Sequence, residues 1–198
     1  MSKKKLSCLP FRRKLQKRTN YKKRMQLLLS NTPRLVIRKS LKNIIAQIVL
    51  YNPDGDKIVV GAQAKELKKL GWQASTGNIP SSYLVGLLLG KKATEKKIIE
   101  AILDLGLHTS AKGGRLYALV KGVVDSGLKI SVDEKVFPTE DRLTGKHISS
   151  YVDKANNNQF SKTKEHAKNI SQQIETIKKK ILERWSWLRK KLKIQLKA

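Results

Sequence analysis

Residues 34–61 read RLVIRKSLKNIIAQIVLYNPDGDKIVVG, and this stretch decides the fold. Three runs rich in β-branched residues, Arg34–Lys39, Asn43–Tyr51 and Lys57–Gly61, are separated by short polar segments, which is typical of strands joined by turns. Asn52-Pro53-Asp54-Gly55-Asp56 is the strongest turn signal of the chain. Because consecutive strands with short connections usually pair as neighbours, the stretch predicts an antiparallel meander.

Helical patterns and one further strand follow this meander. We expect a short helix at about 62–70 closed by Gly71, a longer helix at 81–97, a buried strand at 100–107, and a helix at 115–126 ending at Gly127. Gly86 and Gly90 have GxxxG spacing in the longer helix, which outside a membrane usually means close packing. The order predicts an α/β (α+β-like) fold, a mixed β-sheet packed by helices.

Two basic segments flank the predicted core and divide the chain into three parts. We predict a basic N-terminal arm at 1–33 with a helix at 10–29, an α/β core at 34–152, and a linker with a basic amphipathic C-terminal helix at 153–198. The core is expected to end in a helix over 139–152, with Thr139 as its N-cap. The last helix, about 163–196, is predicted from apolar residues at spacings of three and four: Ile170, Ile174, Ile177, Ile181, Trp185, Leu188 and Leu192.

Charge is the strongest functional signal of the chain. Its 198 residues carry a formal net charge of +28, and fifteen basic residues precede the first acidic residue, Asp54. Such a one-sign block repels itself unless a polyanion neutralises it, so nucleic acid or an anionic membrane is the expected partner. No apolar run approaches the ~20 residues that span a bilayer, and the single cysteine, Cys8, forms no intramolecular disulfide. We therefore expect an intracellular, cytoplasmic protein.

The spacing of the cations favours RNA as that polyanion. In the predicted arm helix, Lys14, Lys17, Arg18, Tyr21 and Arg24 fall close to one face. A second set, Arg34, Arg38 and Lys42, recurs at even spacing, which places it on one face of the sheet, opposite an apolar face. Cations neutralise phosphates and an aromatic ring stacks on unpaired bases. DNA is less favoured because no helix-turn-helix, zinc-finger or leucine-zipper pattern is present.

Catalytic and metal-binding patterns are weak. The histidines His108, His147 and His166 are scattered, without cysteines at metal-ligand spacing, so we expect ordinary surface or core histidines. Glu95, Glu100 and Asp104 cluster in the sequence, and a nuclease-like two-carboxylate metal site stays open as an alternative. Ion pairing with nearby basic residues is the favoured interpretation. The sequence predicts no enzyme, no metal and no cofactor.

Several motifs, in order, resemble one known family over about residues 10–150. They include Thr19-Asn20-Tyr21-Lys22-Lys23-Arg24, Pro33–Ser40, Ile45-Ala46-Gln47, Gly71-Trp72, Thr76-Gly77-Asn78, Pro80-Ser81, Leu103-Asp104, Gly127-Leu128 and His147-Ile148. The chain resembles the archaeal-type large-subunit ribosomal proteins of the eighteenth universal family. Asn20 stands where members often carry an acidic residue, and the chain after about 153 shows no such match.

The resemblance implies a structural constituent of the large ribosomal subunit. Family members bind 5S rRNA, help attach it to large-subunit rRNA in the central protuberance, and contact neighbouring ribosomal proteins; no small-molecule substrate is implied. The residues we expect at the rRNA are Arg12, Arg13, Lys14, Lys17, Arg18, Tyr21, Lys22, Arg24, Arg34, Arg38, Lys39, Lys42, Thr76, Asn78, Lys112 and Arg115.

Two alternatives to a ribosomal role stay open at the level of sequence. One is a basic RNA-binding protein outside the ribosome. The other is a membrane-surface protein, because Trp185, Trp187 and the lysines of the last helix are typical of an interfacial helix. We favour packing of that helix on a protein or RNA neighbour, since the N-terminal arm requires RNA in any case.

Overall fold

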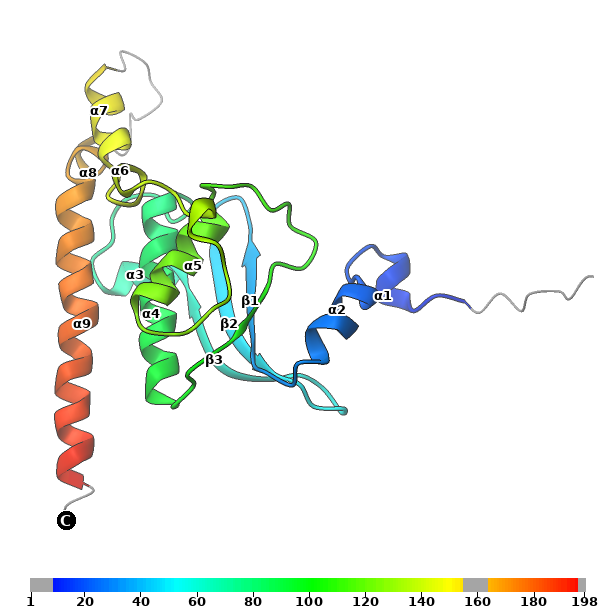
Figure 1. Ribbon diagram of the computed structural model, residues 1–198. Coiled ribbons are helices and arrows are strands. Elements are labelled where there is room, and N and C mark those ends of the chain that lie inside the picture. Colours follow the sequence, from blue (N-terminus) through cyan, green and yellow to red (C-terminus); the bar gives the residue numbers. More distant parts are fainter. Residues whose placement is uncertain (1–8, 155–163, 196–198) are drawn as a thin grey trace, which may run out of the picture.

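A four-stranded sheet forms the centre of the computed structural model, which describes residues 9–154 and 164–195, with side chains as far as Glu183 in the last helix. Helices cover one face of the sheet, and a short helical arm lies over the other (Figure 1). The strands are β1 (Arg34–Lys39), β2 (Ile44–Leu50), β3 (Lys57–Gln63) and β4 (Ile102–Asp104). The helices are α1 (Arg12–Leu15), α2 (Tyr21–Leu28), α3 (Ala64–Lys69), α4 (Ile79–Glu95), α5 (Arg115–Asp125), the 3₁₀ turn η1 (Glu134–Val136), α6 (Glu140–Leu143), α7 (Lys146–Lys154), α8 (Lys164–Lys168) and α9 (Ile170–Gln195).

The sheet has the order β3-β2-β1-β4, which confirms the predicted meander and the mixed α/β class. β1 pairs antiparallel with β2, and β4 lies parallel to β1 on its other side. The strand expected at 100–107 is shorter than predicted, because Gly106 adopts a left-handed φ of 62° and turns the chain away from the sheet. Glu100 makes only an isolated bridge to Lys129.

The core lies between the inner face of the sheet and helices α4 and α5. Leu35, Ile37, Ala46 and Ile48 alternate toward this core and are fully buried, as period-two patterning requires. The predicted helical faces are also buried: Tyr83, Leu84, Leu87 and Leu88 of α4, and Leu116, Leu119, Val120 and Val123 of α5. The two helices touch at glycines, which confirms the packing role of Gly86 and Gly90.

α9 lies alongside α4 and forms an outer layer of the molecule (Figure 1). Its predicted stripe Ile170, Ile174, Ile177 and Ile181 is buried in the main hydrophobic cluster. Hydrogen bonds fix the helix at its sides: Lys180 Nζ donates to the Leu70 carbonyl (3.2 Å), and the Gln73 N–H donates to Gln173 Oε1 (3.4 Å). The first half of the C-terminal helix therefore belongs to the core, and the side chains of Trp185, Leu188 and Leu192 lie outside the described part.

Three predicted helices are interrupted. The prediction of a single helix at 10–29 is wrong. Lys17 adopts a left-handed φ of 52°, which ends the first helix, and Asn20 caps a new helix by accepting the Lys23 N–H at Oδ1 (3.1 Å). Gly145, with a φ of 74°, divides the segment 139–152 into α6 and α7.

The third interruption lies in the last helix, where the described part of the predicted span 163–196 consists of α8 and α9. Thr139 precedes α6 as predicted, although its side chain makes no capping hydrogen bond. Cys8, the tail 1–8 and the linker residues 155–163 lie outside the described residues.

Candidate nucleic-acid interface

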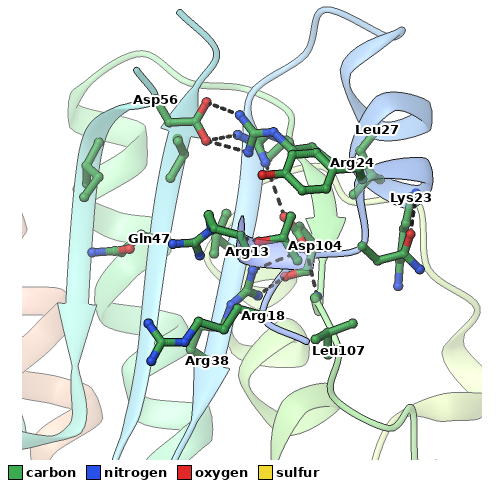
Figure 2. A pocket seen from close by; sticks show the side chains of 18 of the residues that line it. Arg13, Arg18, Lys23, Arg24, Leu27, Arg38, Gln47, Asp56, Asp104 and Leu107 are labelled. Carbon is green, nitrogen blue, oxygen red and sulfur yellow. Dashed lines mark hydrogen bonds and ion pairs between the residues drawn. The ribbon is translucent and has the colours of Figure 1, made fainter. Parts of the chain in front are cut away.

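A cavity of about 710 Å³ separates the N-terminal arm from the outer face of the sheet, and we call it the arm cavity. α1 and α2 form one wall, and the outward residues of β1, β2 and β3 form the other (Figure 2). Its lining includes six cations, Arg13, Arg18, Lys23, Arg24, Arg34 and Arg38, and two carboxylates, Asp56 and Asp104. The described lining thus carries an excess of four positive charges.

Alternating arginines and aspartates connect the arm to the sheet. Arg24 of α2 makes a two-pronged pair with Asp56, with both nitrogen–oxygen distances at 2.8 Å. Asp56 also accepts from Arg34 (2.7 Å), and Arg34 reaches Asp104 of β4 (3.3 Å). Arg38 lies 3.6 Å from the other oxygen of Asp104. The series of contacts runs from the arm, through the turn after β2, to the central strand β1 and the edge strand β4 (Figure 2).

Arg34 is the most buried residue in this series of ion pairs, with a side chain only 3% exposed. A charge in such a place needs paired carboxylates, because desolvation otherwise costs several kcal/mol. Its Nε atom is buried without a hydrogen-bond partner in the described part of the molecule. Arg34 therefore holds β1, β4 and the β2–β3 turn together.

The ion pairs shift the pKa values of both partners at the arm. The hydrogen bond from Arg24 lowers the pKa of Asp56 most strongly, burial opposes this, and Arg34 lowers it further. The same hydrogen bond raises the pKa of Arg24 above its ordinary value, against the effect of burial. Both groups are therefore charged at neutral pH, and the arm is docked by electrostatic contacts rather than by buried apolar residues, which α2 lacks.

Apolar and aromatic groups complete the cavity. Val36, Val49 and Ile58 form a floor on the outer face of the sheet, and Val49 is only 5% exposed. Gln47, which pairs in register with Val36, places an amide on this floor. Tyr21 lines the arm side and contacts the ring of Phe11, with centroids 4.9 Å apart. The cavity therefore combines guanidinium groups, an amide and apolar surface.

A second group of predicted residues lies around the turn that follows β1. Arg115 NH1 donates to the carbonyls of Gly77 (2.9 Å) and Leu41 (3.3 Å), and the Thr76 hydroxyl donates to the Lys42 carbonyl. Asn78 caps α4 by accepting the Ser81 N–H (2.9 Å). These polar groups are used to hold the β1–β2 turn against the start of α4.

The sixteen predicted residues thus fall into three sets, and their contact with RNA stays a prediction. Exposed arm cations outside the cavity lining form the first set: Arg12, Lys14, Lys17 and Lys22. The second set lines the arm cavity: Arg13, Arg18, Tyr21, Arg24, Arg34 and Arg38. The third lies around the β1–β2 turn or the start of α5: Lys39, Lys42, Thr76, Asn78, Lys112 and Arg115.

Two expectations about these residues are wrong. The expected single face of Lys14, Lys17, Arg18, Tyr21 and Arg24 does not form, because the arm helix breaks at Lys17. The even-spacing argument is correct for Arg34 and Arg38, which share the outer face with Val36, but β1 ends at Lys39 and Lys42 lies in the following turn.

Sequence reasoning missed Lys23, Gln47, Asp56 and Asp104 as parts of this region. Gln47 alternates with inward Ala46 and Ile48, so its outward position was readable from the strand pattern. Asp56 lies in a turn, 32 residues from Arg24 and 22 from Arg34. No local sequence pattern predicts its ion pairs with these two arginines.

The alternative metal site has no support in the described part of the chain. Asp104 is engaged by Arg34 and Arg38, while Glu95 ends α4 and Glu100 lies outside β4. Within residues 9–154 and 164–195, no group of three or more His, Cys, Asp or Glu residues is arranged to hold a metal ion.

His108 has a structural role that leads to a pH prediction. Its Nε2 accepts the Lys39 N–H (3.2 Å), which ties the loop after β4 to the end of β1. Burial, followed by the charges of Arg38 and Lys39, lowers the pKa of His108. The neutral ring therefore stabilises the fold at pH values above the ordinary histidine pKa of about 6.5. This contribution is lost as the pH falls through the lower pKa of the folded state.

We expect the free energy of unfolding to fall by up to ~1 kcal/mol between pH 7.5 and 5, the net value of about one hydrogen bond. His108→Ala should remove this fall in the free energy of unfolding, whereas His147→Ala, at an exposed histidine, should leave the fall unchanged. Denaturant titrations at both pH values measure the effect. An equal pH slope in the His108→Ala variant and the unmodified protein would contradict the assignment.

The membrane-surface alternative meets a structural obstacle. The apolar stripe of α9 from Ile170 to Ile181 packs on the core and is not available to lipid. Among the helices in the described ranges, none is long and apolar enough to cross a bilayer.

Comparison with known proteins identifies the family of the chain. The family model described as "Ribosomal large subunit proteins 60S L5, and 50S L18" matches residues 8–100, which hold the arm, the meander and α4. The large ribosomal subunit protein uL18 of Caldivirga maquilingensis is 46% identical over 187 residues, covering 89% of this chain and 90% of the relative. The chain therefore belongs to the uL18 family of large-ribosomal-subunit proteins.

Proposed function

We propose that this protein binds 5S rRNA and helps to attach it to the large-subunit rRNA in the central protuberance of the cytoplasmic ribosome. As a uL18 family member the chain is a structural component of the large ribosomal subunit and not an enzyme. The observation that carries the proposal is the arm cavity, where six cations face two carboxylates that are already ion-paired within the protein. The excess positive charge favours the binding of phosphate groups, because they release the counterions that otherwise balance it.

One basic region lies over the outer face of β1 and the other lies around the turn that follows this strand, so the two suit contacts with separate RNA segments. In the proposal, the arm and its cavity bind 5S rRNA, and the exposed Lys42 and Lys112 of the second region contact the large-subunit rRNA. Arg24 and Arg34 act chiefly by positioning the arm and the strands, because their guanidinium groups are engaged by Asp56 and Asp104. Neighbouring ribosomal proteins are the remaining expected partners.

Filter binding with transcribed 5S rRNA and an unrelated RNA of equal length tests this proposal. We expect 5S rRNA to bind at least tenfold more tightly at moderate salt, because shape and unpaired bases add to the phosphate contacts. The logarithm of the affinity should fall steeply and linearly with the logarithm of salt concentration. Equal affinity for the two RNAs would reject a specific 5S rRNA role.

Deletion of residues 1–29 should weaken 5S rRNA binding at least tenfold. Binding should then release several fewer counterions, so the affinity should depend less steeply on salt concentration. The deleted part holds eleven basic residues and no acidic residue. Helices α1 and α2 bury no residue, so the core should stay folded, and the circular-dichroism spectrum should lose only the signal of these two helices. A truncated protein with unchanged affinity would show that the arm is not the main RNA contact.

A further inference from the structure

We infer that the arm cavity binds one unpaired nucleotide of RNA, with its phosphate at Arg13, Arg18 and Arg38 and its base on the floor beside Gln47. The inference rests on the proposed function, since 5S rRNA would supply the nucleotide. It goes beyond a general phosphate contact because it assigns a place to a base.

Three guanidinium groups in the cavity have unused hydrogen-bonding capacity. Arg18 makes no side-chain hydrogen bond or ion pair with any described residue, and Arg13 donates only from Nε, to the Thr19 hydroxyl (3.0 Å). Arg38 is 45% exposed at its side chain, donates from NH1 to the carbonyls of Ile37 (2.8 Å) and Asp104 (3.0 Å), and has NH2 3.6 Å from the Asp104 carboxylate. Guanidinium forks match the oxygens of a phosphate, so these three groups, two from the arm and one from β1, suit the nucleotide's backbone (Figure 2).

The floor of the cavity has the chemistry of a base-binding surface. Val36 and Ile58 offer apolar contact to a flat ring, Val49 is too buried to add much surface, and Tyr21 lines the opposite side. The Gln47 amide supplies both donors and an acceptor, which suit the edge of a base. A cavity of about 710 Å³ falls within the roughly 300–1,000 Å³ of sites that enclose small ligands.

An unpaired nucleotide fits this arrangement better than the surface of a duplex. A duplex presents phosphates to the protein and keeps its bases stacked inside, so only the three arginines would find a partner. A splayed-out base reaches the apolar floor and the amide as well as the arginines. The combination of both surfaces in one cavity therefore favours a single-stranded loop or bulge.

Filling the cavity tests the inference without removing any cation. Gln47→Trp occupies the floor, and Ile45→Trp is the matched control, because Ile45 lies on the same face of β2 two residues away, is 39% exposed and does not line the cavity. We expect Gln47→Trp to weaken 5S rRNA binding about tenfold, as loss of a stacked base typically does. Ile45→Trp should stay within about threefold of the unmodified protein.

Chemical probing of the bases in 5S rRNA gives a second readout. The unmodified protein and Ile45→Trp should protect one unpaired base that Gln47→Trp leaves reactive, while the remaining footprint persists. If the tryptophan lowers the melting temperature, Gln47→Ala replaces it, with an expected loss of about threefold to fivefold and reduced protection of the same base.

Unchanged affinity and unchanged protection in both Gln47 variants would overturn the nucleotide assignment. So would an Arg18→Ala variant that loses affinity when the unmodified complex protects no unpaired base, because the cavity would then contact duplex phosphates only. Failure of the unmodified protein to prefer 5S rRNA would reject the proposed function instead, so the two failures are distinguishable.

Discussion

Gly86→Ala is expected to destabilise the protein by about 3 kcal/mol, the upper range for an overpacked core. An added Cβ at Gly86 would overlap the carbonyl oxygen of Leu119 on α5 and lie 3.0 Å from the Leu119 carbonyl carbon and the Val123 nitrogen. All three are backbone atoms, so no side chain can move aside. α4 and α5 must separate, which disturbs the packing of both against the sheet. The melting temperature should fall by roughly 6–12 °C.

Gly61→Ala is the matched control for this substitution. A Cβ at Gly61 in β3 would meet only Gln47 Cγ at 3.8 Å and the Ala46 oxygen at 4.0 Å, which are ordinary contacts. Its melting temperature should stay within about 2 °C of the unmodified protein. Thermal denaturation of both variants measures the difference, and a Gly86→Ala variant that melts like Gly61→Ala would show that the helices can separate at little cost.

Gly122→Ala extends the test from the other helix. Its Cβ would overlap the Tyr83 carbonyl oxygen on α4, so it demands the same separation as Gly86→Ala. The double variant should therefore lose clearly less stability than the sum of the single variants.

Asp56→Ala should cost about 2 kcal/mol of stability and release the arm from the sheet. The substitution removes both oxygens that bind Arg24 and one partner of the buried Arg34. Arg34 keeps Asp104 at 3.3 Å, so the loss should stay below the 3–5 kcal/mol typical of a fully broken buried pair. Denaturant unfolding measures the stability, and trypsin cleavage within the arm, expected to be several-fold faster, reports the release.

Asp54→Ala is the matched control, since it removes the same charge from the same turn and Asp54 is exposed. It should leave both stability and the rate of arm cleavage nearly unchanged. The difference between the two variants also has a pH dependence: the lowered pKa of Asp56 means that its pairing stabilises the fold above about pH 4 and is lost as pH falls through the folded value. Equal cleavage rates for the two variants at pH 7 would show that Arg24 does not dock the arm.

The sheet and the helical faces were predictable because their signals are local. Alternation in residues 34–61 defines the meander, and the isoleucine spacing from Ile170 to Ile181 defines the buried face of α9. The break in the arm was not predictable, since residues 11–29 contain no glycine or proline and the left-handed Lys17 has no sequence signature. A backbone conformation chosen by capping and by docking on the core overrides helix propensity there.

The candidate site was predictable only in part, for a related reason. Even spacing placed Arg34 and Arg38 on one face, because side-chain direction along a strand alternates. The aspartates that engage them come from distant segments, and only the assembled sheet brings β4 and the β2–β3 turn to β1. The sequence therefore showed where positive charge gathers but not which cations are occupied within the protein.

The packing of α9 on α4 has a consequence for synthesis. The contacts between Gln73 and Gln173, and between Leu70 and Lys180, join residues 100 and 110 positions apart. A nascent chain that has emerged as far as α7 can pair its strands, yet the surface of α4 that Ile170 to Ile181 cover is still open to water. Exposed apolar surface of this kind favours aggregation. Docking of the last helix is therefore the folding step that protects the newly synthesised protein from aggregation.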